Sequence, residues 1–346
     1  MTIKELARLA GVSKTTVSFV FNKPDRVSEE TRNRVLEIAA RTGYNPDPVA
    51  RSLKTKKHHM IGFLLPELTP EGFRNPLLFQ ILQGLREGCL PHNLSLNVIS
   101  PPPGKLLESL RCTAVDGVII YGMINDPRLI EYLQKKRLPC VSFDGGIRMP
   151  IAAVTSDDRR GAQELMAFIL RKGHRDILIL SFRDIEDRGA SFVQSAGYRR
   201  LSGYRDALEE QGLSIQSDSI HIHPCDECSE EGGYRAMTEW YSLSGKRPTA
   251  VVAMSDVIAM GVYRFCRDRG ITIPGELSVC GFDGLPLGSL LQPRLTTVMQ
   301  PAEEKGAAAV GLLMDEIENP GSVRSFRFQT ELLKGASTAV ISENSD

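Results

Sequence analysis

Residues 10–22 read AGVSKTTVSFVFN, and this stretch decides how the N-terminal part of the chain folds. Gly11 suits the left-handed turn that ends one helix, and Ser13 suits the cap of the next. Upstream, Thr2 and Glu5 have the spacing of a capping box, which opens the first of these helices. Two helices joined by so short a turn cross steeply, so the stretch predicts a helix-turn-helix.

A third helix is expected to complete this N-terminal unit, with Ser28 as its cap and Gly43 near its end. The apolar residues of the three helices recur at helical spacing, which predicts one small core and leaves a face of the second helix exposed. These apolar residues are Ile3, Leu6, Ala7 and Ala10, then Val17, Val20 and Phe21, then Val35, Leu36, Ile38 and Ala39.

The 346 residues carry no net charge in total, but the charge is unevenly distributed. Residues 1–57 have a net charge of +6, and the rest of the chain has a net charge of −6. This asymmetry suggests that the basic segment binds a polyanion. The exposed face of the second helix presents Lys14, Thr15 and Ser18 and no carboxylate, which phosphate would repel. Together these features predict DNA binding, with a solvated helical bundle for protein contact as the alternative.

The second helix would read bases with the residues near its N-terminus. Lys14 can donate to guanine O6 and N7, and Thr15 can contact a base edge or a thymine methyl group. Short polar side chains nearby suit phosphate oxygens, which fix the register of the protein on the duplex. The predicted phosphate contacts are Ser13, Thr16, Ser18, Asn22 and Ser28.

A hinge helix and linker are expected in residues 46–59. Asp47 lies between two prolines and can cap a helix from Val49 to about Lys54. So short a helix is unstable alone in water and should order only against a partner. An exposed leucine beside basic residues suits insertion into the minor groove of DNA. The residues predicted to make this contact are Val49, Ala50, Arg51 and Leu53.

From residue 60 to about 340, short apolar runs alternate with amphipathic helices. This alternation predicts doubly wound parallel sheets, and the number of units favours two α/β subdomains with a cleft between them. The fold class is therefore α/β, with an all-α head in residues 1–45. The expected strands are 60–66, 94–100, 116–122, 139–145, 176–182, 249–255 and 277–283, and the expected helices are 76–90, 159–173, 198–212 and 256–270.

Polar residues follow several of the expected strands, where open parallel sheets bind their ligands. Carboxylates and an arginine at this edge suit the hydroxyl groups of a sugar or polyol, although each could instead be a helix cap or a loop end. The residues are Asp144, Ser156, Asp157, Arg183, Arg200, Ser255, Asp256 and Asp283, of which Arg200 and Asp283 are the principal candidates.

The motifs TIKELARLAGVSKTTVSFVFN and RVSEETRNRVLEIAARTGYNPDPVARSLKT resemble the DNA-binding head and hinge of the LacI/GalR (lactose-repressor) family of bacterial transcription regulators. The resemblance implies that Lys14 and Thr15 occupy the family's main base-reading positions and that Leu53 occupies its minor-groove position. Phe19 stands at a third base-reading position, where many members have arginine. Its base would be read by apolar contact or not at all.

The motifs GYRRLSGYRDALEEQGL, AMSDVIAMGVYRF and VCGFDGLPLGSLLQPRLTTVMQP resemble the periplasmic-binding-protein-like effector domain of the same family. The resemblance implies that Arg200 holds sugar hydroxyls with Asp283 as its acidic partner. Ser255 and Asp256 stand where most members have Asn-Asp. Cys228 stands where many sugar-binding members have an aromatic ring, which argues against a plain hexopyranoside. The predicted effector-binding residues are Arg200, Asp283, Asp256, Ser255, Asp157, Asn75 and Cys228.

The stretch HIHPCDEC, residues 221–228, has histidines and cysteines at spacings found in metal sites. A structural zinc ribbon would need a second ligand pair, which is missing, so no metal and no cofactor are predicted. The chain has no nucleophile elbow, phosphate-binding loop or H-E-x-x-H motif, so the motifs do not indicate an enzyme.

The sequence thus predicts a homodimeric transcription regulator, more typically a repressor, of a carbohydrate-utilisation operon. Its partners would be a pseudo-palindromic double-stranded operator and a sugar, sugar phosphate, polyol or sugar acid that shifts a two-state equilibrium. Seven scattered cysteines and an N-terminus without an apolar signal segment predict a cytoplasmic protein, and no apolar run is long enough for a membrane. The alternatives are a solute-binding protein, or a sugar-modifying enzyme with a fused DNA-binding domain.

Overall fold

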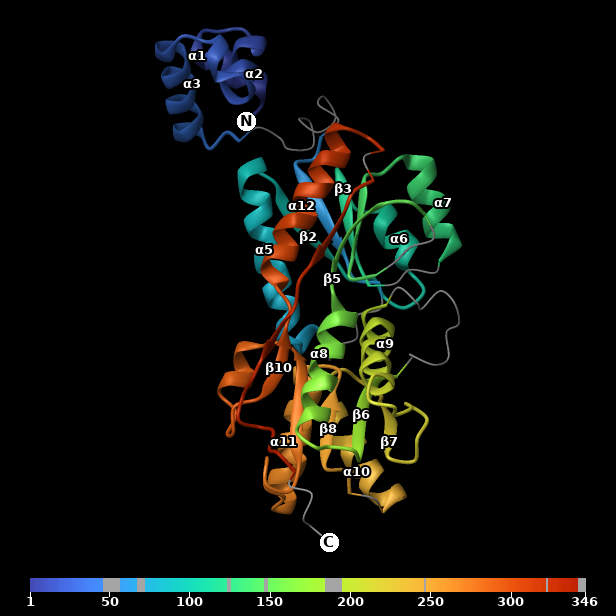
Figure 1. The fold of residues 1–346 in the computed structure, drawn as a ribbon. Coiled ribbons are helices and arrows are strands. Elements are labelled where there is room, and N and C mark those ends of the chain that lie inside the picture. Colours follow the sequence, from blue (N-terminus) through green and yellow to red (C-terminus); the bar gives the residue numbers. More distant parts are fainter. Residues whose placement is uncertain are drawn as a thin grey trace. The chain divides into compact units, whose positions relative to one another are not determined.

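The computed structural model describes residues 1–45, 57–66, 72–122, 126–145, 149–183, 195–245, 247–321 and 323–341. The chain forms two compact units, residues 1–58 and 59–346 (Figure 1). The predicted hinge contacts Val49, Ala50, Arg51 and Leu53 lie outside the described residues.

The first unit contains three helices: α1 (Ile3–Ala10), α2 (Lys14–Asn22) and α3 (Glu29–Thr42). Thr2 and Glu5 form the predicted capping box, because the backbone N–H of each donates to the side chain of the other at 2.8 and 3.3 Å. Ser13 and Ser28 cap the next two helices, and Gly11 has the left-handed conformation at φ 65°. The predicted helix-turn-helix and its third helix are confirmed.

The core of this unit consists of the buried residues Leu6, Ala7, Ala10, Val17, Val20, Val35 and Ala39. Ile3, Phe21 and Ile38 pack against it and are partly buried. The prediction that Leu36 is buried is wrong, because its side chain is 41% exposed. It follows Val35 directly, and a turn of about 100° per residue directs it away from the face that packs on the other helices.

The second unit contains two lobes, each built on a six-stranded sheet. The sheet of the first lobe has the order β11-β5-β4-β3-β1-β2 and is parallel throughout. Its strands are β1 (Met60–Leu64), β2 (Ser95–Ile99), β3 (Gly117–Tyr121), β4 (Cys140–Phe143), β5 (Ala152–Ser156) and β11 (Ser325–Phe328).

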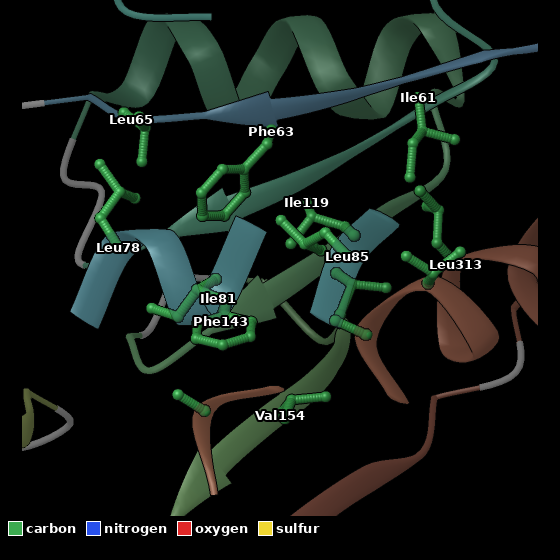
Figure 2. Close-up of a cluster of buried hydrophobic side chains, with 14 of the residues drawn as sticks. Ile61, Phe63, Leu65, Leu78, Ile81, Leu85, Ile119, Phe143, Val154 and Leu313 are labelled. Carbon is green, nitrogen blue, oxygen red and sulfur yellow. The ribbon is translucent and has the colours of Figure 1, made fainter. Parts of the chain in front are cut away.

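Helices cover both faces of the sheet in the first lobe (Figure 1). On one face α5 (Pro76–Cys89) and α12 (Ala302–Glu318) enclose a core that includes Phe63, Ile81 and Leu313 (Figure 2). The other face packs on α6 (Leu106–Arg111) and α7 (Pro127–Lys136). Short 3-10 turns occur at Gly72–Arg74 and Leu90–His92.

The second lobe repeats this arrangement, with the strand order β12-β10-β9-β8-β6-β7. Only β12 is antiparallel to its neighbour within the described sheet. The strands are β6 (Ile177–Phe182), β7 (Ile220–Cys225), β8 (Ala250–Ala253), β9 (Ser278–Asp283), β10 (Thr296–Met299) and β12 (Glu331–Leu333). The helices are α8 (Asp158–Arg171) and α9 (Ala196–Glu209) on one face and α10 (Glu230–Ser244) and α11 (Asp256–Arg269) on the other.

The chain passes between the lobes three times, after β5, after β10 and after β11. Each expected strand and helix of this unit has an observed counterpart, so the predicted pair of doubly wound subdomains is confirmed. The expected strands did not include β5, β7, β10, β11 and β12. No helix in the described ranges is both long and apolar enough to cross a membrane.

Candidate functional site

The polar face of α2 is exposed as predicted. Lys14 and Thr15 lie in its first turn and point away from the core, and that turn contains no acidic residue. Val17 and Val20, on the opposite face of α2, are buried in the core of this unit and hold the helix in place. Its N-terminal residues are therefore presented on a rigid support, as base reading by a recognition helix requires.

The predicted phosphate-contacting residues are tied to the helix ends. The hydroxyl of Ser13 accepts from the backbone N–H of Thr16 at 3.0 Å, and the amide of Asn22 donates to the carbonyl of Ser18 at 2.8 Å. Ser28 caps α3 by accepting from the Thr31 backbone N–H at 3.4 Å. Each of these side chains has hydrogen-bonding capacity beyond these local contacts.

Phe19 is partly buried, and the side chain of Arg26 lies near its ring. The guanidinium of Arg26, in the 3-10 turn Pro24–Arg26, lies 6.0 Å from the centre of the Phe19 ring. That distance is at the limit of a cation–π contact. Sequence reasoning did not single out Arg26, because the contact joins a helix to the turn that follows it.

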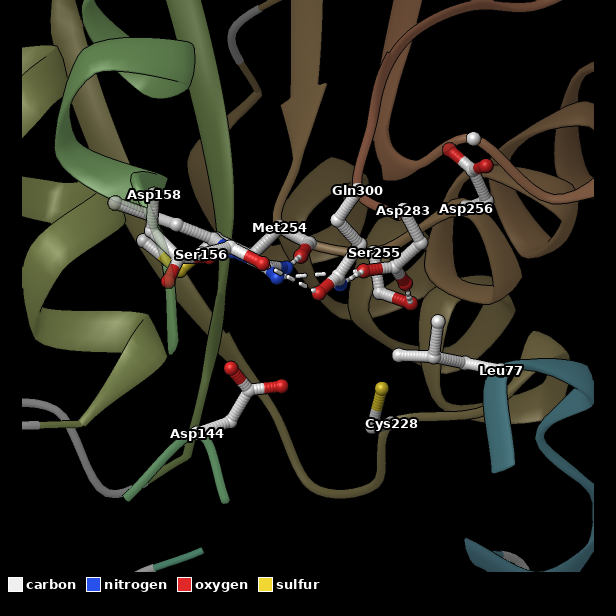
Figure 3. Close-up of polar contacts among 12 residues, drawn as sticks. Leu77, Asp144, Ser156, Asp158, Cys228, Met254, Ser255, Asp256, Asp283 and Gln300 are labelled. Carbon is white, nitrogen blue, oxygen red and sulfur yellow. Dashed lines mark hydrogen bonds and ion pairs between the residues drawn. The ribbon is translucent and has the colours of Figure 1, made fainter. Parts of the chain in front are cut away.

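Arg200 lies on α9 and is only 3% exposed. Its Nε donates to Asp158 Oδ1 at 3.0 Å and its Nη2 to Asp283 Oδ1 at 3.3 Å, while its Nη1 donates to the carbonyl of Met254 (Figure 3). The guanidinium also lies 3.7 Å from the centre of the Phe282 ring. Groups from α8, β9 and the end of β8 thus fix the arginine in one orientation.

Asp283 is the last residue of β9, and its carboxylate accepts hydrogen bonds from three side chains. Besides the contact with Arg200, its Oδ2 accepts from the Ser255 hydroxyl at 2.7 Å and its Oδ1 accepts from the Gln300 amide at 2.8 Å. Its φ of 129° is unusual for a residue with a side chain. The predicted residues Arg200, Asp283 and Ser255 are therefore brought together.

The charged groups of this cluster alter one another's pKa values. Burial alone would lower the pKa of Arg200, but Asp158 and Asp283 outweigh it and raise that pKa. Burial alone would raise the pKa of Asp158, but the attraction of Arg200 and Arg199 lowers it. Burial raises the pKa of Asp283, and Arg200 opposes that shift. Arg200 is consequently a permanent cation with Asp158 as its ionised partner.

Lys305 forms a second buried cluster that the sequence interpretation did not include. It lies on α12, is completely buried, and its Nζ donates to Asp144 Oδ2 at 2.5 Å, Ser156 Oγ at 2.8 Å and Gln300 Oε1 at 2.8 Å. Because Gln300 also donates to Asp283, the two clusters are continuous. We call Arg200, Asp158, Asp283, Gln300, Lys305 and Asp144 the inter-lobe network.

Lys305 could have been found from the sequence. It falls in the same helical stripe as Ala302, Ala309 and Leu313, all of which are buried. A lysine in an otherwise apolar or small-residue stripe predicts a buried cation, which needs a carboxylate partner. That partner, Asp144, was among the polar residues expected at the strand ends.

Asp256 and Asp157 have different surroundings from Arg200. Asp256 is 0% exposed, and its oxygens accept from the Thr297 hydroxyl at 2.5 Å and from the backbone N–H of Leu285 at 2.7 Å. Burial and then the charge of Asp283 raise the pKa of Asp256 to about 7. The ion pairs with Arg199 and Arg200 are made by Asp158, the residue that follows Asp157.

Asn75, Cys228 and Tyr121 lie between the two lobes. The amide of Asn75 is 3.8 Å from Cys228 Sγ, and its Oδ1 caps α5 at the backbone N–H of Leu77. Burial and the charge of Asp283 raise the pKa of Cys228 to about 12, so this thiol stays protonated at neutral pH. Burial, followed by the charges of Asp144 and Asp283, also raises the pKa of Tyr121.

The histidines of HIHPCDEC face different acidic residues. His221 Nε2 lies 3.6 Å from Asp176 Oδ1, and His223 Nε2 lies 3.4 Å from Glu239 Oε2. In the part of the chain that the structure describes, no group of three or more His, Cys, Asp or Glu side chains could hold a metal ion. Arg183 is largely exposed beside Asp226, outside the inter-lobe network.

Two family models match the chain. Residues 2–47 match bacterial regulatory proteins of the lacI family, and residues 166–338 match a periplasmic binding protein-like domain. The chain is also 32% identical over 327 residues to the ribose operon repressor of Haemophilus influenzae, which covers 92% of each chain. The chain belongs to the LacI family.

Further similarities cover nearly the whole length of this LacI-family chain. It is 31% identical over 341 residues to the transcriptional repressor PurR of Photobacterium profundum, covering 96% of this chain and 97% of that one. A lac repressor dimer bound to operator and the anti-inducer ONPF shares the fold, with a TM-score of 0.81 at 23% identity over 98% and 99% of the two chains. A LacI-family regulator of Enterococcus faecium with bound ribose has a TM-score of 0.72 at 26% identity, over 82% and 100% of the chains.

Membership of the LacI family confirms the resemblance, the fold class and the general function predicted from the sequence. This LacI-family chain is a DNA-binding transcription regulator with a small-molecule effector, not an enzyme. The assignments of individual residues and the domain boundaries stay predictions.

Proposed function

We propose that this LacI-family regulator is a cytoplasmic homodimeric repressor whose operator affinity is set by a small polyhydroxy effector bound between the two lobes. The observation that carries the proposal is Arg200, a buried guanidinium fixed by Asp158 and Asp283 at the carboxyl edge of the second sheet. Ligands of open parallel sheets bind at this edge.

The chemistry of this cluster suits hydroxyl groups. A guanidinium has five N–H donors, and three of those of Arg200 have acceptors within the protein. A sugar hydroxyl could accept from a remaining N–H and donate to Asp283, and both hydrogen bonds would be charge-assisted. Asn75 and Cys228 would line the opposite wall, and Ser255 would orient Asp283.

The head is proposed to read one half-site of a pseudo-palindromic operator, with two heads contributed by the homodimer. Lys14 and Thr15 would contact base edges, while Ser13, Thr16, Ser18, Asn22 and Ser28 would contact phosphates. Phe19 would contact a thymine methyl group. The effector would change operator affinity only as far as it binds the two conformations of the dimer unequally.

The proposal is tested with DNA fragments selected by the purified protein from a random library. Their affinity is measured with and without free sugars, polyols, sugar phosphates and sugar acids. Arg200→Ala should remove the response to any active compound and leave operator affinity unchanged. Arg267→Ala, at an exposed position of the same lobe, is the matched control and should respond normally. A response that survives Arg200→Ala would place the effector elsewhere.

A further inference from the structure

The helices α6 and α7 lie side by side on the first lobe, and a groove of about 760 Å³ runs between them (Figure 1). This volume is in the range of sites that hold a ligand. The residues that line the groove are all distinct from those of the inter-lobe network. The charged groups of the lining are four cations and two carboxylates, Arg111, Arg128, Lys135, Lys136, Glu108 and Glu131.

The groove is basic, whereas the unit that carries it is acidic. Residues 104–111 and 126–137, which include both helices, contain six Lys or Arg and three Asp or Glu, a net charge of +3. Residues 58–346 as a whole carry a net charge of −6. Exposed charges act over roughly 10 Å at physiological salt, so this part of the surface attracts a negatively charged partner that the unit as a whole repels.

The acidic side chains beside the groove already have basic partners. Each pair is joined at 2.9 to 3.1 Å, and the pairs are Lys105–Glu108, Arg128–Asp126 and Lys135–Glu131. Arg111 and Lys136, in contrast, form no ion pair with a described residue. The guanidinium of Arg111 lies 5.4 Å from the centre of the Tyr132 ring, and Lys136 follows Tyr132 by one helical turn. One end of the groove therefore presents two cations that are available to a partner.

The cations extend along the groove and are not gathered around one point. Arg128 and Lys136 lie on the same helix, and the rise of an α-helix separates their Cα atoms by about 12 Å along its axis. One phosphate or carboxylate group cannot contact both ends, whereas an extended peptide of about four residues spans this length. Leu107 and Tyr132 also line the groove and are partly buried, so they offer apolar surface between the charges.

The two carboxylates of the lining distinguish among negatively charged partners. Glu108 and Glu131 lie among the cations. Lys105 and, to a smaller extent, Arg111 lower the pKa of Glu108, so this carboxylate is ionised at neutral pH. Both glutamates would repel the regularly spaced phosphates of a nucleic acid. A protein segment can place a neutral or basic residue opposite each glutamate and keep the attraction of the cations.

We propose that the groove between α6 and α7 is a docking surface for an acidic, extended segment of another protein. One carboxylate of the segment accepts hydrogen bonds from Arg111 and Lys136, and a second carboxylate contacts Arg128 at the other end. An apolar side chain between them packs on Leu107 and Tyr132. Arg128 can exchange its present partner, because an exposed ion pair is weak. This surface lies outside the effector site, so the inference goes beyond the proposed function.

The test uses a display library of random heptapeptides and the full-length protein. The library is first depleted on the double variant Arg111→Glu/Lys136→Glu, which removes peptides that bind elsewhere, and is then selected on the unaltered protein. The selected peptides should contain at least two Asp or Glu residues. Their affinity, measured by fluorescence anisotropy, should be at least tenfold weaker for the double variant, while the melting temperature and the operator affinity of that variant should stay the same.

Arg171→Glu/Arg267→Glu is the matched control, because both arginines are exposed in the last turns of α8 and α11 and their reversal changes the net charge equally. It should bind the peptides as the unaltered protein does. Selected peptides without acidic residues, or an equal loss of affinity in the control, would overturn the inference. Displacement of the peptide by an equal concentration of inorganic pyrophosphate would overturn it in favour of a small-anion site. A loss of affinity for a non-operator duplex that exceeds the loss in the control would overturn it in favour of nucleic acid.

Discussion

The DNA-reading head and the inter-lobe network hold their polar side chains in opposite ways. In the head, Lys14 and Thr15 are exposed on a helix that is stabilised by local caps and a small apolar core. In the inter-lobe network, Arg200 and Lys305 are buried, and their carboxylate partners are remote in sequence. Asp283 lies 83 residues from Arg200, and Asp144 lies 161 residues from Lys305.

This difference has a consequence for substitutions. An exposed side chain on a helix that is already capped and packed can be replaced with little effect on folding. A buried ion that connects several elements cannot, because its removal leaves another charge without a partner. Substitutions of the exposed side chains of α2 that make no cap should therefore change DNA binding without changing stability. Substitutions in the network should change both stability and the effector response.

The largest expected effect is that of Lys305→Met. The substitution leaves Asp144 as a buried charge without its cation, which should lower the free energy of unfolding of the second unit by about 3–5 kcal/mol. Urea denaturation measures this value. Asp144→Asn in the same chain should restore much of the loss, whereas Lys135→Met, at an exposed lysine on α7, should change little. A double variant that is no more stable than the single one would show that the pair is not coupled.

Lys14→Ala should have the next largest effect, confined to DNA binding. Loss of a base contact should weaken operator affinity roughly 10- to 100-fold and relax the preference at one base pair. Titration of labelled operators with single base changes measures both. The melting temperature should stay the same, and Lys4→Ala on α1 should leave the base preference intact. An equal loss of affinity on every sequence would mean that Lys14 contacts phosphate instead.

Asp256 should make stability depend on pH. Because its pKa is raised from 3.8 to about 7 in the folded protein, the folded state holds a proton there that the unfolded state has released. Its contribution is therefore present at low pH and is lost as the pH rises through about 7, with a slope of up to ~1.4 kcal/mol per pH unit. Asp256→Asn, which resembles the protonated form, should flatten the curve between about pH 4 and 7. If the free energy of unfolding of Asp256→Asn has the same pH dependence as that of the unaltered protein, the dependence arises from other groups.

The smallest expected effect distinguishes the two roles of Ser28, which caps α3 and is predicted to contact a DNA phosphate. Ser28→Ala and Thr2→Ala each remove the hydroxyl that caps a helix, and each should cost about 1 kcal/mol of head stability. Only Ser28 is predicted to contact phosphate, so only Ser28→Ala should also weaken binding, equally for all operator sequences. Equal operator affinities for the two variants, measured well below their melting temperatures, would remove Ser28 from the interface.

The head could be predicted almost completely because its signals are local. The cap of α1 lies three residues from its partner, and the turn glycine lies within the quoted stretch. The error at Leu36 came from the third helix, where the apolar stripe is broader than the face that packs. The residues of the hinge could be named from a pattern but lie outside the described residues.

The candidate site could be predicted only in part, because its partners are assembled by the fold. Arg200 and Asp283 were recognised by their motifs, and Ser255 joins them through Asp283. The sequence prediction named Asp157 and not Asp158. Two adjacent aspartates at the start of a helix cannot be told apart from the sequence, and only the ion pairs of the folded protein distinguish them. Lys305 was overlooked because a lysine is expected to be exposed, although its helical stripe indicated burial.

The effector and the operator are proposed to bind through one coupled equilibrium, and the affinity of the effector reports this coupling most directly. Calorimetry of the active compound with the full-length protein, alone and saturated with operator, gives the two values. The two affinities should differ by the same factor by which the effector changes operator affinity, because such coupling is reciprocal. Equal effector affinities in the two states would show that the two sites are not coupled.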